Sequence, residues 1–246
     1  MTQLGLSHFP HLHLLVSGGN SQLILLASWD DWQIIGQTLD DAAGECFDKT
    51  GRMLGLKYPA GISISRIAKM HLNNYLELPI SMQKSGNYNY SFSGLKTAVR
   101  NQINKINQSQ NLGLVYEKPL NPIQFQTLVD AQSLADIEAL EPGDLPKLEF
   151  IYKACVSIQT VIVAQLISKV TKAIVDYQPK SLGVSGGVSA SLILRQELTK
   201  LSDRYNLGDL LLPQLKYTGD NAVMIGLAGI LDDMIAESPQ KPTILA

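Results

Sequence analysis

The sequence predicts an α/β fold in which helices flank a mixed sheet, and three stretches of the chain support this prediction. Two apolar runs separated by Gly18 and Gly19 predict a β-hairpin over residues 12–27. Apolar residues at helical spacing predict a long buried helix over 148–177, which leads into an apolar strand at 181–184. A further helix and a short strand follow, and this alternation is typical of an α/β domain.

Length and composition limit the class of protein. At 246 residues the chain can bury a substantial core, and 45% hydrophobic with 17% charged residues is ordinary for a soluble protein. The formal net charge of −2 gives no overall attraction for nucleic acid. Cys46 and Cys155 lie far apart, which favours a reducing compartment. With no signal-like start and no apolar run approaching about 18 residues, we expect a cytoplasmic protein without a membrane span.

The sequence Val-Ser-Gly-Gly occurs twice, at residues 16–19 and 184–187, each time at the end of a predicted strand. A tight turn between strands explains either copy by itself. Glycine has no Cβ, however, so a phosphate or carboxylate can approach the backbone N–H groups of such a turn. The pair therefore suggests two glycine-rich edges that grip one nucleotide.

A predicted third strand at 33–36 leads into a helix that begins after Thr38 or Asp40 and ends near Leu56. The spacing of three carboxylates, Asp41, Glu45 and Asp48, predicts that they share one face of this helix. Their repulsion would be relieved by a cation or a hydroxyl-rich ligand. A solvated helix face is the alternative reading.

The middle of the chain is predicted from shorter patterns. A turn at 58–61 precedes a helix over 62–75, and alternating aromatic residues predict a strand at 88–92. A helix over 95–106 follows, and its Ser-Gly start with Lys96 in the first turn suits an anion. We interpret residues 107–146 as an irregular insertion with one helix, over 122–139, and assign it no chemistry.

The end of the chain predicts a helix over 191–205, a strand at 210–212 and a last helix over 222–235. Asp220 precedes that last helix directly after a glycine turn. It is either a helix cap or a carboxylate that faces a ligand.

Six segments, taken together, resemble one family. In chain order they read LLVSGGNSQL (14–23), DDAAGECFDK (40–49), YPAG (58–61), YSFSGLKT (90–97), SGGVSA (185–190) and GDN (219–221). The combination is similar to the TsaD/Gcp family, the tRNA-adenosine threonylcarbamoyltransferases built on the two-lobed actin-like fold. The resemblance covers nearly the whole chain. It implies that residues 1–246 form the second, C-terminal lobe, with a last helix at about 220–236 packing toward the first lobe.

The resemblance also implies roles for single residues. The phosphate or acyl part of threonylcarbamoyl-adenylate would contact the first glycine turn, at Leu15, Val16, Ser17, Gly18 and Gly19. The remaining substrate contacts would come from both sides of the nucleoside, at Asp48, Gly61, Gly186, Gly187 and Ser191, the last standing where the family usually has Asn. Asp48 and Lys49 are the implied catalytic residues. Asp220 is the implied ligand of one divalent metal, iron or zinc, which would polarise the carbamoyl carbonyl or neutralise the leaving group.

The implied reaction transfers the threonylcarbamoyl group to N6 of adenosine 37 in tRNAs that read ANN codons, with AMP as the leaving group. The implied partners are tRNA and accessory proteins of the TsaB and TsaE type, with no membrane. In the family a preceding lobe carries a His-x-x-x-His motif that supplies two metal ligands, and this chain starts after that motif. His11 and His13 fall on strand positions, so we do not expect them to replace it. We therefore expect the chain alone to hold an incomplete site.

Two other functions remain open at this point. A non-catalytic descendant could keep the nucleotide-binding turns and serve as a scaffold. An upstream reading frame that encodes His-x-x-x-His would favour the transferase, and its absence together with no bound metal would favour the scaffold. A small-molecule kinase or ATPase of the same superfold fits less well, because the DDAAGE and SFSGLK segments match the transferase.

Overall fold

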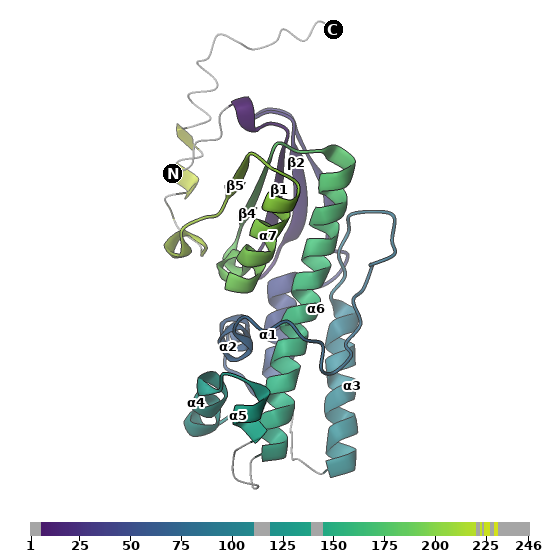
Figure 1. Ribbon diagram of the computed structural model, residues 1–246, viewed down its shortest axis with the longest axis vertical. Helices are drawn as coiled ribbons and strands as arrows, with labels where there is room; N and C mark the ends of the chain where they lie inside the picture. Colours follow the sequence, from purple (N-terminus) through teal and green to yellow (C-terminus); the bar gives the residue numbers. More distant parts are fainter. Residues whose placement is uncertain are drawn as a thin grey trace, which may run out of the picture.

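A computed structural model describes residues 6–110, 119–138 and 145–219, with residues 222, 224–226 and 229–230 beyond them. Its sheet has five strands in the order β3-β2-β1-β4-β5 (Figure 1). The strands are β1 (His11–Val16), β2 (Ser21–Leu26), β3 (Trp32–Gln37), β4 (Ser181–Ser185) and β5 (Asp209–Leu211). β1, β2 and β3 pair antiparallel, whereas β4 is parallel to both β1 and β5. The predicted hairpin and mixed sheet are confirmed.

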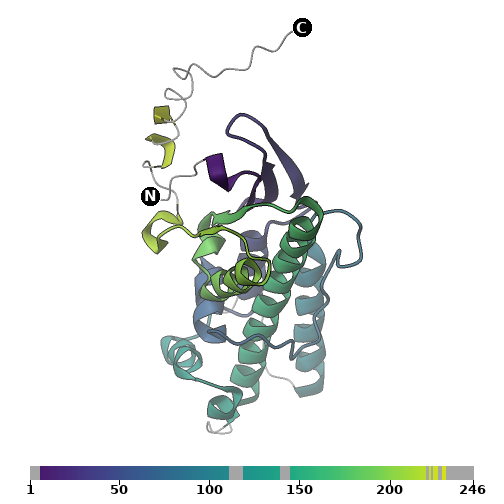
Figure 2. The same cartoon turned by 45° about the horizontal axis from the view of Figure 1, so that its top comes forward.

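Helices account for most of the remaining described chain. They are α1 (Ala43–Met53), α2 (Ala60–Ala68), α3 (Ser93–Gln110), α4 (Pro122–Asp130), α5 (Leu134–Glu138), α6 (Leu145–Tyr177) and α7 (Leu192–Arg204). Short 3-10 turns occur at Leu6–His8, Gly187–Ala190 and Leu215–Tyr217. In Figures 1 and 2, α6 runs from beside the sheet to the α4–α5 end of the molecule.

The core lies between one face of the sheet and the helices. Alternation along β1 places Leu12, Leu14 and Val16 on this face, where all three are fully buried. Leu23 of β2 lies opposite Leu14 and Val184 of β4 lies beside it, and both belong to the same core cluster. The other face of β1 therefore carries His11, His13 and Leu15.

Helix α6 is long and apolar enough to cross a membrane, judged by length and composition alone. However, 78% of its most apolar window is buried inside the protein, which is typical of the core helix of a soluble fold. Four polar side chains of α6 are buried as well: Ser157, Gln159, Gln165 and Lys169. Lys169 is 2% exposed and donates hydrogen bonds to Met82 O (2.8 Å), Ser85 Oγ (2.7 Å) and Asn87 O (2.9 Å). Lys169 therefore holds the segment before α3 against α6.

The structure corrects two predicted elements before α3. The helix expected over 62–75 ends at Ala68, because Lys69 adopts a φ of 49° that a helix cannot continue. The strand expected at 88–92 forms only an isolated bridge between Thr38 and Tyr90. Its neighbours bond to side chains instead: Asp40 accepts hydrogen bonds from the N–H of Phe92 at 2.7 Å and from that of Ser93 at 3.1 Å.

The region interpreted as an insertion contains two helices, not one. The helix expected over 122–139 breaks after Asp130, and α5 restarts at Leu134. Asp136 accepts hydrogen bonds from the N–H groups of Gln132 (2.7 Å) and Ser133 (2.8 Å), which caps the new helix. The last predicted helix, at about 220–236, lies mostly outside the described residues.

Candidate functional site

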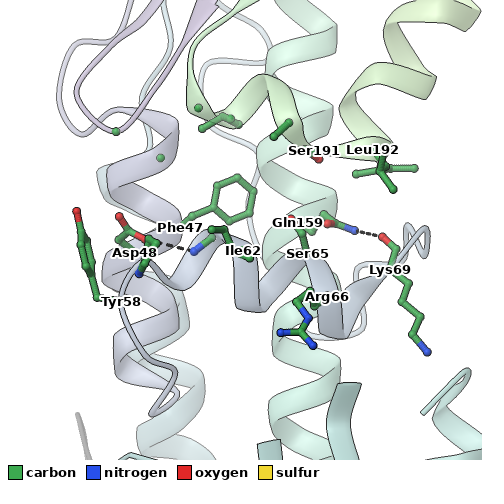
Figure 3. A pocket seen from close by; sticks show the side chains of 18 of the residues that line it. Phe47, Asp48, Tyr58, Ile62, Ser65, Arg66, Lys69, Gln159, Ser191 and Leu192 are labelled. Atoms are coloured by element: carbon green, nitrogen blue, oxygen red, sulfur yellow. Dashed lines mark hydrogen bonds between the residues drawn. The ribbon is translucent and has the colours of Figure 1, made fainter. Parts of the chain in front are cut away.

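A cavity of about 650 Å³ lies at the edge of the sheet where β1 and β4 end. Because these neighbouring strands are parallel, both glycine turns reach the same edge, where α/β proteins commonly bind ligands. Figure 3 shows side chains from α1, α2, α6 and the start of α7 around this cavity. Its lining is mainly apolar and comprises Gly18, Gly44, Phe47, Asp48, Tyr58, Pro59, Gly61, Ile62, Ser65, Arg66, Lys69, Met70, Gln159, Gly187, Val188, Ala190, Ser191, Leu192 and Ile193.

The glycines at this edge leave room for a ligand. Apart from its chain neighbours, an added Cβ at Gly18 or Gly187 would meet no atom of the described residues within 4 Å, although both glycines line the cavity. Gly44, at the start of α1, is different, because its Cβ would lie 2.6 Å from Ser17 O. The Gly44 N–H donates to that same carbonyl at 3.1 Å, so α1 docks directly on the first glycine turn. Open backbone at Gly18 and Gly187 suits a phosphate or another anionic group.

Asp48 borders the cavity and fixes the start of α2. Its Oδ1 accepts hydrogen bonds from the N–H groups of Ala60 at 2.7 Å and Gly61 at 3.2 Å. Figure 3 draws Asp48 beside the start of α2, with the bond to Gly61 dashed. The carboxylate therefore caps a helix N-terminus, where negative charge is favoured. Pro59 at the N-cap position has no side-chain acceptor of its own, so this capping oxygen comes from α1.

The predicted cluster of three carboxylates separates into two arrangements. Asp41 precedes α1, and Lys49 Nζ bridges its Oδ1 and Glu45 Oε1, each at 2.7 Å. The hydrogen bond to Asp41, followed by that to Glu45, raises the pKa of Lys49 above its usual range. Lys96 Nζ lies 3.7 Å from Asp41 Oδ2 and adds a second positive charge. Lys49 and Lys96 thus relieve the repulsion between Asp41 and Glu45, and Lys49 does not belong to the cavity lining.

Half of the residues predicted to bind substrate line the cavity: Gly18, Asp48, Gly61, Gly187 and Ser191. The others, Leu15, Val16, Ser17, Gly19 and Gly186, belong to the strands and turns behind it. Val16 is buried in the core, and Ser17 Oγ accepts the Asn20 N–H at 3.0 Å within the first turn. Asp220, the predicted metal ligand, lies outside the described residues.

Sequence reasoning missed the wall that α2 contributes. Ile62, Ser65, Arg66 and Lys69 all line the cavity, and their spacing of three, four and seven residues is that of one helix face. This spacing can be recognised in the sequence alone. Gln159 of α6, by contrast, lies 90 residues from Lys69, whose carbonyl it binds, and no local pattern predicts that contact.

His11 and His13 form a chain of hydrogen bonds between β1 and β4. Ser181 Oγ donates to the carbonyl of residue 8 (2.8 Å), so His11 Nδ1 donates to Ser181 Oγ (2.6 Å). His13 Nδ1 then donates to His11 Nε2 (3.3 Å), and Ser185 Oγ donates to His13 Nε2 (2.8 Å). Burial lowers the pKa of both rings to about 4, helped in His11 by the charge of His13. Both rings are neutral at pH 7 and bound to protein groups.

Comparison with known proteins identifies the family. A family model described as "TsaD: tRNA N6-adenosine threonylcarbamoyltransferase" matches residues 1–227. The tRNA N6-adenosine threonylcarbamoyltransferase of Polynucleobacter asymbioticus is 39% identical over 230 residues, covering 94% of this chain and 56% of the relative. The enzyme of the same description from Carboxydothermus hydrogenoformans is 38% identical over 221 residues, or 90% and 54%. The chain spans about half the length of the curated relatives it matches. With its mixed sheet flanked by helices, the chain belongs to the TsaD family.

Proposed function

We propose that this chain forms the nucleotide-binding part of a tRNA threonylcarbamoyltransferase and binds threonylcarbamoyl-adenylate in the cavity. One observation supports this most directly: a largely apolar space of about 650 Å³ is bordered by open glycine backbone from both turns and by Asp48. Such a combination suits a ligand with an apolar base and an anionic group. The names of the relatives favour transfer over a non-catalytic scaffold.

In this proposal the phosphate and the acyl group lie against the backbone of Gly18 and Gly187. The base and ribose occupy the apolar part between Phe47, Ile62 and Leu192, which face the same space in Figure 3. The N6 amine of adenosine 37 attacks the carbamoyl carbon and loses a proton. A C–N bond forms, the bond from that carbon to the phosphate oxygen breaks, and AMP leaves.

The metal of the family is a separate matter. Membership implies a metal-dependent enzyme, and iron or zinc with Asp220 as one ligand remains our prediction. Within the ranges that the structure describes, no three His, Cys, Asp or Glu side chains gather to hold an ion. The described residues therefore do not fit a metal centre by themselves, and we derive no step through one.

The remaining partners follow from the same proposal. We propose that tRNA is the acceptor and that accessory proteins of the TsaB and TsaE type take part. We propose further that this chain forms the second lobe of an actin-like enzyme and that it is located in the cytoplasm. The net charge of −2 means that attraction for tRNA must come from a local patch or from a partner.

Two experiments test the proposal. Isothermal titration calorimetry of the full chain with AMP should give saturable binding, and Asp48→Ala should weaken it at least tenfold. Expression in cells without the transferase, alone and together with the N-terminal half of a curated relative, should restore threonylcarbamoyladenosine in the second case. Mass spectrometry of tRNA nucleosides measures this. The proposal would be overturned if AMP bound neither to the chain alone nor to the chain together with the N-terminal half, and if the tRNA stayed unmodified.

A further inference from the structure

Lys69, directly after α2, has an unusual backbone conformation beside the cavity. Its φ of 49° and ψ of −129° lie outside the regions that side-chain-bearing residues commonly adopt. Such a conformation persists only where surrounding contacts hold it, and it is typical of residues with a task in a binding site.

Contacts from three directions hold Lys69. Its N–H donates to Ser65 O at 2.9 Å, and its carbonyl accepts from Gln159 Nε2 of α6, also at 2.9 Å. Its Nζ donates to Ala131 O at 2.5 Å and to Asp130 O at 3.4 Å. Asp130 is the last residue of α4 and Ala131 its C-cap, so the ammonium group binds the end of a helix that favours a cation.

Two neighbours of Lys69 contact the same α4–α5 segment (residues 119–138). The Arg66 guanidinium lies 5.7 Å from the centre of the Phe125 ring, within the range of a cation–π contact. His71 Nε2 donates to Gln132 O at 2.7 Å. Figure 3 shows the side chains of Arg66 and Lys69 directed away from Phe47 and Ser191, so their charged groups are turned out of the cavity.

We propose that Lys69 is a positioning residue through which the α4–α5 segment holds α2 against the nucleotide cavity. This inference rests on the proposed function, since it gives the segment a part in nucleotide binding. α2 is a nine-residue helix fixed at its start by Asp48 and beyond its end by Lys69. Between the two, Ile62 and Ser65 form the cavity wall. Releasing the far end lets this wall move and weakens ligand binding.

The test is Lys69→Met in the full chain, which keeps an apolar stem but removes the three N–H donors. We expect AMP to bind at least tenfold more weakly by calorimetry, with unchanged far-UV circular dichroism. Hydrogen exchange should become faster in residues 60–68 and in residues 122–138. Lys69→Arg, which restores a donor, should return both measurements to within threefold of the unmodified chain.

The matched control is Lys200→Met on α7, where the ammonium group bonds Glu197 at 2.7 Å and does not line the cavity. It should change neither AMP binding nor exchange in residues 60–68. If Lys69→Met does not fold, His71→Ala removes a single contact to the same segment. We then expect about threefold weaker AMP binding and faster exchange in residues 122–138.

The outcomes separate the possibilities. Weaker AMP binding without faster exchange would mean that Lys69 contacts the nucleotide directly, and faster exchange with unchanged AMP binding would mean that the segment does not shape the cavity. Either result overturns the inference. If the unmodified chain binds no AMP, the tRNA nucleoside assay decides the proposed function, and exchange in residues 60–68 decides the positioning role alone: an unchanged rate in Lys69→Met overturns it.

Discussion

The two glycine turns share the sequence Val-Ser-Gly-Gly but need glycine for different reasons. In the second turn Gly186 has a φ of 90°, and an added Cβ would lie 2.2 Å from Val16 O. In the first turn Gly18 has free space around it, and the crowded residue is Gly44 on α1, whose Cβ would lie 2.6 Å from Ser17 O. A repeated motif therefore does not mean a repeated geometry: the crowded glycine of the second turn lies within the motif, at Gly186, whereas the one at the first turn lies outside it, at Gly44.

The largest expected effect on stability is at the second turn. Gly186→Ala should lower the free energy of unfolding by roughly 3 kcal/mol, because the new side chain adds a backbone clash to a left-handed φ. Urea denaturation followed by circular dichroism measures this. A loss below about 1 kcal/mol would show that β1 and β4 separate easily, and the contrast between the turns would fail.

The histidine chain that joins the strands of the two turns predicts a loss of stability in acid. The pKa of His11 and of His13 is about 4 in the folded protein and 6.5 in the unfolded chain. The unfolded state therefore takes up protons first, and stability that is fully present above pH 6.5 is lost as the pH falls toward 4. We expect a loss of about 2 kcal/mol by pH 5 for each histidine that stays neutral.

Denaturation curves at pH 7, 6 and 5 check this slope. His13→Gln should flatten it, whereas His71→Gln, at an exposed histidine bonded to Gln132 O, should not. Equal slopes in all three proteins would assign the acid sensitivity to groups outside the histidine chain.

A third variant tests the capping of α2 opposite the turns. Asp48→Ala removes the acceptor of two N–H groups, and we expect a loss of about 1 kcal/mol in unfolding free energy. This change should reduce AMP affinity more than it reduces stability. A fall in stability without any change in AMP binding would mean that Asp48 serves the fold alone.

The smallest effect on stability is expected at the first turn. Gly18→Ala adds a methyl group that, beyond its chain neighbours, meets no atom within 4 Å in the part of the chain that the structure describes, so the free energy of unfolding should change by less than about 0.5 kcal/mol. The methyl group enters the cavity, however, and AMP binding should weaken clearly. Unchanged AMP binding in this variant would place the ligand away from the first turn.

Periodicity and turn residues predicted most of the fold and part of the site. The hairpin, the mixed sheet and α6 follow from local patterns, and so does Gly18 of the cavity, whereas Asp48 was placed there only by the family resemblance. Local patterns failed where the decisive partner is distant in the chain. Residues 88–92 alternate like a strand but bond to Gln37 and Asp40, and α2 stops early at Lys69, which Gln159 and Ala131 hold.

The continuity of α6 has a consequence for how the molecule tolerates change. Gln159 binds the carbonyl of Lys69 from the same helix on which Lys169, ten residues later, fastens the segment before α3. A helix advances about 1.5 Å and turns about 100° with each residue, so the two side chains keep a fixed separation and phase. One residue inserted between Gln159 and Lys169 would rotate one of these side chains away from its hydrogen-bond partners while leaving the other in place. The length and the phase of α6 therefore fix the positions of these two contacts relative to each other.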